Sequence, residues 1–316
     1  MKLIIQIPCF NEAQTLAIAL ADLPHELPGF DTVEWLIIDD GCADNTVEVA
    51  KANGVDHVVS FPKNCGLAKA FLAGIDASLR LGADVIVNTD ADNQYCAADI
   101  PKLVAPILAG KAEIVIGARP INEISHFSPV KKLLQRFGSW IVRITSNTSI
   151  PDAPSGFRAM SRNAAMQLHV FNQYTYTLET IIQAGLKGMV ITSVPIRTNG
   201  DLRPSRLVKS ISSYVRRSVV TILRIFMTYK PLRCFAVPGV ISFIAGLFIG
   251  LRFIYFYLTG DGSGHIQSLI LCALLLGTGF FLVITGLIAD LISVNRRLLE
   301  NIDYRLKKIE LFKSDN

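Results

Sequence analysis

Two long uncharged runs near the C-terminal end constrain the fold of this 316-residue chain more than any other feature. The first covers residues 234–251 and continues over 253–258, and the second covers 266–289. Each run approaches the roughly 20 apolar residues that an α-helix needs to cross a bilayer. Hydrophobic residues make up 51% of the chain and the mean hydropathy is +0.40, which is too apolar for a purely water-soluble protein. The sequence therefore predicts a membrane segment, 234–292, with transmembrane helices at about 234–258 and 266–290.

Basic residues flank both outer ends of this predicted hairpin, and its connecting turn contains none. Residues 203–233 carry eight Lys or Arg and no acid, and six more Lys or Arg follow residue 295. Because Lys and Arg accumulate in cytoplasmic loops, we expect both termini and the N-terminal domain to be cytoplasmic. Apolar residues recur at near-helical spacing in 203–233, which predicts amphipathic helices on an anionic membrane surface. A solvated basic helix is the alternative for 203–233, and a charged tail helix is expected in 293–316.

Residues 1–202 alternate between short apolar stretches and helical patterns, which predicts a mostly parallel, doubly wound sheet. Gly66 opens one of the helices, but its surroundings match neither the P-loop nor the dinucleotide-binding fingerprint. Asp99 is expected to cap a following helix. The six cysteines are scattered without a Cys-x-x-Cys pair, so neither a disulfide framework nor a zinc site is indicated. The expected strands are 2–7, 35–38, 55–60, 84–87, 113–117 and 190–196.

Acidic side chains follow the predicted strands at the edge where a parallel sheet binds ligands. Asp90 and Asp92 come directly after apolar residues 85–87, and Asp39 and Asp40 follow 35–38. Carboxylate oxygens suit a hard divalent cation, and such a cation suits a phosphate group. The alternative for the first pair is a polar turn with solvated acids, and receiver domains also cluster acids at strand ends.

Asn11 and Glu12 follow the first predicted strand and belong to the same edge. The alternative for them is an ordinary helix cap. Arg119 follows a later strand, where it could bind phosphate or form an ion pair with the acids.

Five stretches occur in the order found in family 2 glycosyltransferases of the GT-A fold, which has a Rossmann-like, mostly parallel sheet. More narrowly, they resemble the polyprenyl-phosphate sugar synthases of the dolichol-phosphate-mannose-synthase group, whose anchored members also carry a basic segment and a two-helix hairpin. Cys42 departs from the Ser that is common in the family, and Lys69 stands in for a basic residue usually found slightly earlier. The matching stretches are 7–12, 38–46, 64–70, 89–94 and 155–158.

The resemblance implies a role for each matching position. Asp90 and Asp92 would hold Mg²⁺ or Mn²⁺ on the donor diphosphate. The residues implied in nucleotide-sugar binding are Pro8, Asn11, Glu12, Asp39, Asp40, Asn64, Lys69, Asp90, Ala91, Asp92, Gln94 and Arg119. Those implied at the acceptor phosphate are Arg158, Arg197, Ser205 and Arg206.

The implied catalytic residues are Asp92, Asp152, Arg158 and Glu179. An acceptor phosphate is already anionic and needs little help from a general base. If a base acts, Asp152 is the first candidate and Glu179 the second. The alternative for Asp152 is a structural acid that holds Arg158.

The activity implied is a metal-dependent, inverting transfer of a sugar from a UDP- or GDP-linked donor to a polyprenyl phosphate, dolichyl or undecaprenyl, at the cytoplasmic membrane face. One alternative is a glycosyltransferase with another lipid or a glycan as acceptor. The other is a non-catalytic, membrane-tethered nucleotide-sugar-binding protein. Membrane lipids are expected partners, a homo-oligomer such as a tetramer is implied by the resemblance, and no nucleic acid is expected.

Overall fold

The computed structural model describes residues 1–120, 138–140, 142–143, 146, 148–170, 176–200, 220, 223–224, 226–260 and 262–314. The chain divides into two compact units, Met1–Ser218 with Asn301–Asn316, and Val219–Glu300. Ser205, Arg206 and most of the predicted interfacial helices lie outside the described residues. The domain boundaries expected from the sequence stay a prediction.

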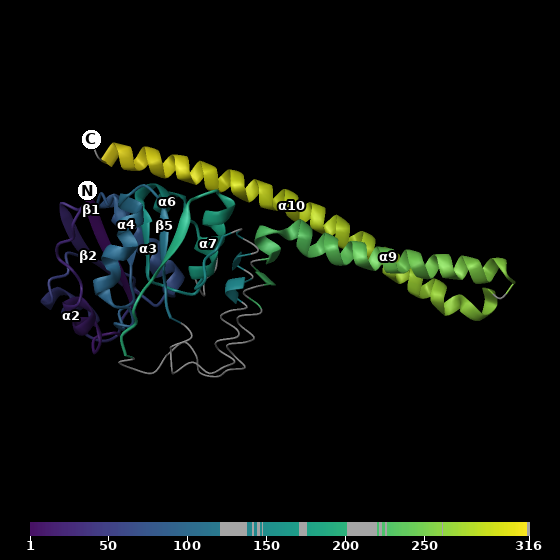
Figure 1. Cartoon of the computed structure of the whole chain (residues 1–316), viewed down its shortest axis with the longest axis horizontal. Coiled ribbons are helices and arrows are strands. Elements are labelled where there is room, and N and C mark those ends of the chain that lie inside the picture. The colour runs from purple at the N-terminus through teal and green to yellow at the C-terminus, as the bar shows by residue number, and fades with distance from the viewer. Residues whose placement is uncertain are drawn as a thin grey trace. The chain divides into compact units, whose positions relative to one another are not determined.

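The first unit is built on a sheet (Figure 1), and its described strands follow the order β3-β2-β1-β4-β6-β5-β7. Strand β6 is antiparallel to β4 and β5, and every other neighbouring pair is parallel. The mostly parallel sheet predicted from the sequence is therefore confirmed, whereas β6 was not expected. The strands are β1 Lys2–Cys9, β2 Thr32–Asp39, β3 His57–Ser60, β4 Val85–Asn88, β5 Ile114–Ala118, β6 Arg158–Ser161 and β7 Ile191–Pro195.

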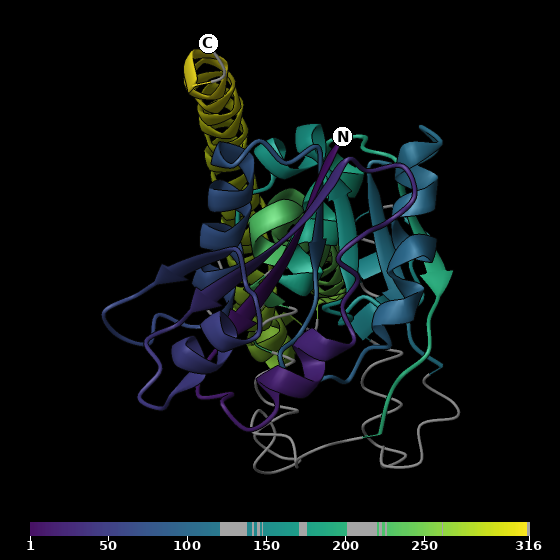
Figure 2. The same cartoon turned by 90° about the vertical axis from the view of Figure 1, so that its left-hand side faces the viewer.

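Helices cover both faces of this sheet, with α3 and α4 on opposite sides (Figure 2). Alternation along β1 explains the two layers, because successive side chains of a strand point to opposite faces. Ile5 belongs to the core cluster that includes Leu20 of α1 and Leu103 of α4. Its neighbour Gln6 faces the other layer, where its Nε2 donates to the carbonyl of Phe71 in α3. The helices are α1 Leu16–Ala21, α2 Thr46–Ala52, α3 Leu67–Arg80, the 3₁₀ helix η1 Ala97–Asp99, α4 Ile100–Leu108, α6 Arg162–Gln167 and α7 Thr177–Leu186.

The second unit is formed by α9 (Pro231–Leu258), the short helix η2 (Gly262–His265) and α10 (Ile266–Ser314), which extends to residue 300 within it. Both long helices are long and apolar enough to cross a membrane. Only 11% of the apolar window of α9 and 17% of that of α10 is buried, unlike the core helix of a soluble domain. The expected tail helix is not separate, since α10 continues through it.

Glycines bring α9 and α10 into backbone contact. A Cβ on Gly279 would lie 2.7 Å from the carbonyl oxygen of Gly239, and one on Gly246 would lie 3.0 Å from the backbone nitrogen of Leu276. Ser242 Oγ also donates to the carbonyl of Leu275 at 2.9 Å. These small residues pack the two helices of one chain together.

Candidate active site

A tight turn after β4 carries Asp90 and Asp92. Its next residue, Asn93, has φ of 54°, a left-handed conformation that is uncommon outside glycine. Asn93 Nδ2 donates to Asp22 Oδ2 at 3.0 Å, and the backbone N–H of Gln94 donates to Asp92 Oδ1 at 3.2 Å. Local hydrogen bonds therefore hold the turn in a conformation that such a residue adopts only where its surroundings favour it.

The surroundings of Asp90 oppose its ionisation. Burial raises the pKa of Asp90 to about 7, and the negative charge of Asp92 adds to that shift. The positive charges of Arg119 and Arg158 act in the opposite direction. The described residues contain no group of three or more His, Cys, Asp or Glu that could hold a metal ion. Carboxylates are oxygen ligands of the kind that a divalent cation accepts, and the binding of a cation by Asp90 and Asp92 stays a prediction.

The loops after β1 and β2 are joined by hydrogen bonds. Asn11, with φ of 55°, accepts a hydrogen bond on its Oδ1 from the backbone N–H of Ala43 at 2.8 Å. The backbone N–H of Glu12 donates to Thr46 Oγ1 at 2.9 Å. The N-cap of α1 is Thr15, so the interpretation of Asn11 and Glu12 as helix caps is wrong.

Asp39 and Asp40 end β2 and are almost completely buried. Asp40 accepts hydrogen bonds from the backbone N–H groups of Cys65 at 2.7 Å and Gly66 at 2.9 Å. Asp39 Oδ1 accepts from the backbone N–H of Cys42 at 2.7 Å. Both acids therefore fix loops at the edge of the sheet, and their contact with a base or ribose stays a prediction.

The loop that Asp40 holds passes very close to Gly41. A Cβ there would lie 2.4 Å from the backbone of Lys63, and the φ of 71° also favours glycine. Asn64 and Lys69 are exposed in this loop and at the start of α3, whereas Pro8 and Ala91 are buried. Of these four predicted site residues, only Asn64 and Lys69 have side chains that a ligand can reach without rearrangement.

Arg119 and Asp152 form a buried ion pair. Asp152 accepts from Nε of Arg119 at 2.8 Å, from Nη2 at 3.0 Å and from the backbone N–H at 3.2 Å. The side chains are 8% and 1% exposed. Burial would lower the pKa of Arg119, but Tyr95 and Asp152 outweigh it and raise that pKa. Asp152 thus holds Arg119, and the alternative in which it holds Arg158 is wrong.

Arg158 points into the core from β6 and is 1% exposed. It donates to Thr180 Oγ1 and to the carbonyl of Ser155, and its guanidinium lies 5.1 Å from the centre of the Tyr176 ring. The positive charge of Arg158 acts to lower the pKa of Asp90. Its guanidinium is buried, so the predicted contact with a phosphate stays a prediction. Glu179 is likewise buried, in the first turn of α7.

Residues 197–199, called the strap below, are hydrogen-bonded to the turn that carries Asp90 and Asp92. The backbone N–H of Asn199 donates to the carbonyl of Gln94 at 2.9 Å, and its Nδ2 donates to the carbonyl of Asn93 at 3.1 Å. Arg197 Nη2 donates to Asp99 Oδ1 at 2.8 Å. Asp99 is the N-cap residue of α4, as predicted, but its side chain makes no cap hydrogen bond and accepts from Arg197 instead.

The ion pair between Asp99 and Arg197 of the strap joins a buried acid to an exposed base. Burial would raise the pKa of Asp99, but hydrogen bonds from Arg197 and Lys102 hold it at about 2. The Arg197 side chain is 62% exposed. Its contact with an acceptor phosphate stays a prediction, and any such contact would share the guanidinium with Asp99.

Residues 4–168 match the family model described as Glycosyl transferase family 2, which is more than half of the chain. The chain belongs to glycosyltransferase family 2. It is therefore a nucleotide-sugar glycosyltransferase, as the order of its motifs indicated.

Curated relatives place this glycosyltransferase beside enzymes named for polyprenyl-phosphate acceptors. The UDP-N-acetylglucosamine–dolichyl-phosphate N-acetylglucosaminyltransferase of Methanococcus voltae is 29% identical, over 61% of this chain and 83% of that protein. The undecaprenyl-phosphate mannosyltransferase of Micrococcus luteus is 27% identical, over 62% and 83%. Glycosyltransferase AglJ of Haloferax volcanii is 26% identical over 94% of this chain and 95% of its own length, so the likeness extends beyond the catalytic region.

Solved structures share the fold. Glucosyl-3-phosphoglycerate synthase from Mycobacterium tuberculosis aligns with a TM-score of 0.57 and 22% identity, over 71% of this chain and 79% of that chain. Another structure of that enzyme, with Mn²⁺, uridine diphosphate and glucosyl-3-phosphoglycerate, aligns with a TM-score of 0.54 and 22% identity, over 70% and 79%. The GT-A fold of the glycosyltransferase is thereby confirmed.

Several residues around the turn were not among the predicted site residues: Asn88, Tyr95, Gly156, Tyr176 and Asn199. Asn88 carried a signal, because it is the polar end of an otherwise apolar strand. Gly156 belongs to the matching stretch 155–158 but was given no role. The other three become visible only through partners that are distant in sequence.

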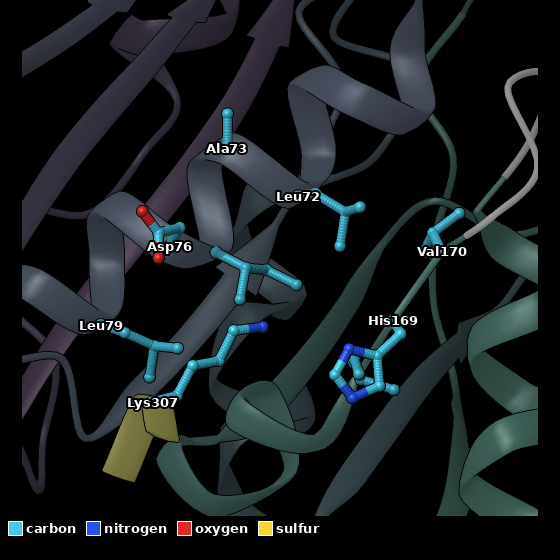
Figure 3. Close-up of a pocket in the computed structure, with 9 residues that line it drawn as sticks. Leu72, Ala73, Asp76, Leu79, His169, Val170 and Lys307 are labelled. Carbon is cyan, nitrogen blue, oxygen red and sulfur yellow. The ribbon is translucent and has the colours of Figure 1, made fainter. Parts of the chain in front are cut away.

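A cavity of about 410 Å³ in the first unit lies away from these residues. Figure 3 shows its lining, with Leu72 and Ala73 on α3, His169 on the segment after α6, and Lys307 on α10. None of its lining residues is a predicted site residue, so we assign the active site to the turn and not to this cavity.

Proposed function

We propose that the protein transfers a sugar from a UDP- or GDP-linked donor to a polyprenyl phosphate, dolichyl or undecaprenyl, in a metal-dependent reaction that inverts the anomeric centre. The observation that carries this proposal is the Asp90–Asp92 turn at the carboxyl edge of the sheet, in a chain whose other unit is a pair of exposed apolar helices. The names of the relatives from Methanococcus voltae and Micrococcus luteus support the acceptor class.

The donor would bind where the loops after β1, β2 and β4 meet. Asn11 and Glu12 would face the nucleotide, together with the loop that Asp40 holds. Asp90 and Asp92 would hold Mg²⁺ or Mn²⁺ on the diphosphate, and the Mn²⁺ in a structural neighbour supports this assignment. When bound, the ion supplies positive charge that stabilises the leaving diphosphate.

In the transfer step, an oxygen of the acceptor phosphate forms a bond to the anomeric carbon. The bond from that carbon to the nucleoside diphosphate breaks, and its electron pair leaves with the diphosphate. The attacking oxygen is already anionic, so no proton has to be removed. We therefore propose that Asp152 orients Arg119, since their ion pair occupies both carboxylate oxygens. Arg119 would stabilise the negative charge that grows on the leaving diphosphate.

The apolar helices would hold the catalytic unit at the membrane that contains the acceptor. We propose that α9 and α10 span the membrane and that both termini are cytoplasmic, because the basic residues flank the outer ends of the hairpin. Arg197, Ser205 and Arg206 would meet the lipid phosphate. Tethering the catalytic unit at the surface that holds the acceptor raises its effective concentration.

The proposal is tested in membranes that contain the protein, undecaprenyl phosphate and a panel of labelled UDP- and GDP-sugars. We expect a solvent-extractable glycolipid that is lost with EDTA and restored by Mn²⁺. Asp92→Ala should lower the rate at least about 100-fold. Asp76→Ala, at an exposed acid on α3, is the control and should keep the rate of the parent.

Two outcomes would contradict parts of this proposal. Activity that persists in EDTA, or that the Asp92→Ala variant retains, would contradict the proposed role of the metal ion. Transfer to a glycan but never to a polyprenyl phosphate would contradict the proposed acceptor class and identify a glycan as the acceptor.

A further inference from the structure

The backbone of Gly156 is fixed by hydrogen bonds at both its N–H and its carbonyl group. Its N–H donates to Tyr95 Oη at 3.0 Å, and its carbonyl oxygen accepts from Asn88 Nδ2 at 2.9 Å. These two side chains are 4% and 0% exposed. A buried peptide whose donor and acceptor are both satisfied has one well-defined position.

Asn88 is itself held from two further sides. Its Oδ1 accepts from Gln6 Nε2 at 2.9 Å, and its Nδ2 also donates to Tyr176 Oη at 2.9 Å. The Tyr176 ring stacks on Phe71 with ring centres 3.8 Å apart. This buried network joins β1, β4 and the start of α7, and both polar atoms of the Asn88 side chain have partners in it, which restricts the movement of that side chain.

The carboxylate of Asp90 lies directly against Gly156. A Cβ on Gly156 would be 3.1 Å from Asp90 Oδ1, 3.1 Å from Oδ2 and 3.1 Å from Tyr176 Oη. Carbon atoms normally keep a larger separation, so any side chain at this position would displace the acid by a few tenths of an ångström. The backbone of Gly156 lies outside the left-handed region. Glycine is thus required here for space and not for conformation.

Among the described residues, packing and not hydrogen bonding gives Asp90 its place. In the described part of the chain, no group donates a hydrogen bond to its carboxylate. The contact with Gly156 therefore has more influence on Asp90 than it would on an acid held by several donors.

We propose that Gly156 is a positioning residue: held by Tyr95, Asn88 and Tyr176, it sets the place of the Asp90 carboxylate relative to Asp92 and so the affinity of the pair for a divalent cation. This inference rests on the proposed metal-dependent function. Metal–oxygen distances tolerate deviations of only about 0.2 Å. A displacement of a few tenths of an ångström is therefore enough to weaken binding.

The test measures Mn²⁺ binding to the full-length protein in detergent with UDP present, by electron paramagnetic resonance. Gly156→Ala should raise the Kd for Mn²⁺ about tenfold and change the spectrum of the bound ion. Its melting temperature without metal should stay close to that of the parent. Tyr176→Phe, which removes a hydroxyl beside the acid and an acceptor of Asn88, should weaken Mn²⁺ binding to a smaller extent.

Gly138→Ala is the matched control, because a Cβ there meets none of the described residues within 4 Å and the backbone is again outside the left-handed region. It should bind Mn²⁺ as the parent does. A folded Gly156→Ala with the parent's Kd and spectrum would overturn the inference and leave the proposed function intact. If Gly156→Ala does not fold, an unchanged Kd and spectrum in Tyr176→Phe would overturn it instead. A parent that binds no Mn²⁺ with UDP would overturn the proposed metal role, and the inference with it.

Discussion

At the scale of single residues, Asp90 should make the proposed metal binding depend on pH. Burial, followed by the charge of Asp92, raises the pKa of Asp90 to about 7, so a cation must displace a proton below that pH. We expect the affinity for Mn²⁺ to rise by about tenfold per pH unit below pH 7 and to level off above it. Titrations with Mn²⁺ from pH 5.5 to 8.5, with UDP present, measure this dependence.

The same pKa acts on stability in the opposite sense when no cation is bound. Unfolding returns Asp90 to its ordinary pKa of about 3.9, so the folded state binds more protons between about pH 4 and 7. The Asp90 contribution to the free energy of unfolding therefore falls as the pH rises through that range. A Kd for Mn²⁺ that stays constant from pH 5.5 to 8.5 would contradict the shift.

Residue patterns predicted where the acids lie but not what they bind. The ends of parallel strands meet at one edge of a sheet, which is why the sequence placed Asp39, Asp40 and Asp90 there. The hydrogen-bond partner of each acid depends on the paths of loops, and the residues next to the acid do not predict those paths. Asp40 binds backbone N–H groups 25 and 26 residues away, and Asp152 binds Arg119 across 33 residues.

At the scale of elements, alternation of strands and helices predicted six strands and missed the seventh. Strand β6 has four residues, follows a loop with two prolines and contains Arg158, so its pattern resembles a loop. It pairs antiparallel with β4 and β5, which separates these two strands. Arg158 projects from β6 into the core, where it contacts Thr180 of α7 and the Tyr176 ring.

The contact between α9 and α10 predicts different effects for two glycines that lie two residues apart. A Cβ on Gly279 would lie 2.7 Å from the carbonyl oxygen of Gly239 and 2.8 Å from the backbone nitrogen of Phe243, whereas one on Gly277 meets nothing within 4 Å. We expect Gly279→Leu to lower the free energy of unfolding by about 1–3 kcal/mol through overpacking. Gly277→Leu should be neutral or slightly stabilising, because leucine favours the helix. Unfolding in mixed micelles measures both, and equal effects would contradict the backbone contact.

At the scale of the whole molecule, composition predicted a water-soluble part and an apolar part. It did not predict that the last residues of the chain belong with the first unit. Tyr304 Oη donates to Asn163 Oδ1 at 2.9 Å, and His169 Nδ1 lies 3.4 Å from Asp303 Oδ2. Contacts across 141 residues of sequence cannot be read from a charged helical pattern, which suits a solvated tail equally well.

The tail should therefore stabilise the unit that contains the active site. A chain that ends after Glu300 loses the hydrogen bond from Tyr304 and the burial of Leu311, which is 8% exposed. We expect a loss of about 2–4 kcal/mol in the free energy of unfolding of this unit. Fluorescence of Trp35, buried in β2, reports its unfolding in detergent. A chain that ends after Leu311 keeps both contacts and should melt with the full-length protein. If both shortened chains melt at the full-length temperature, the tail adds no stability, and its contacts with the first unit are incidental to the fold.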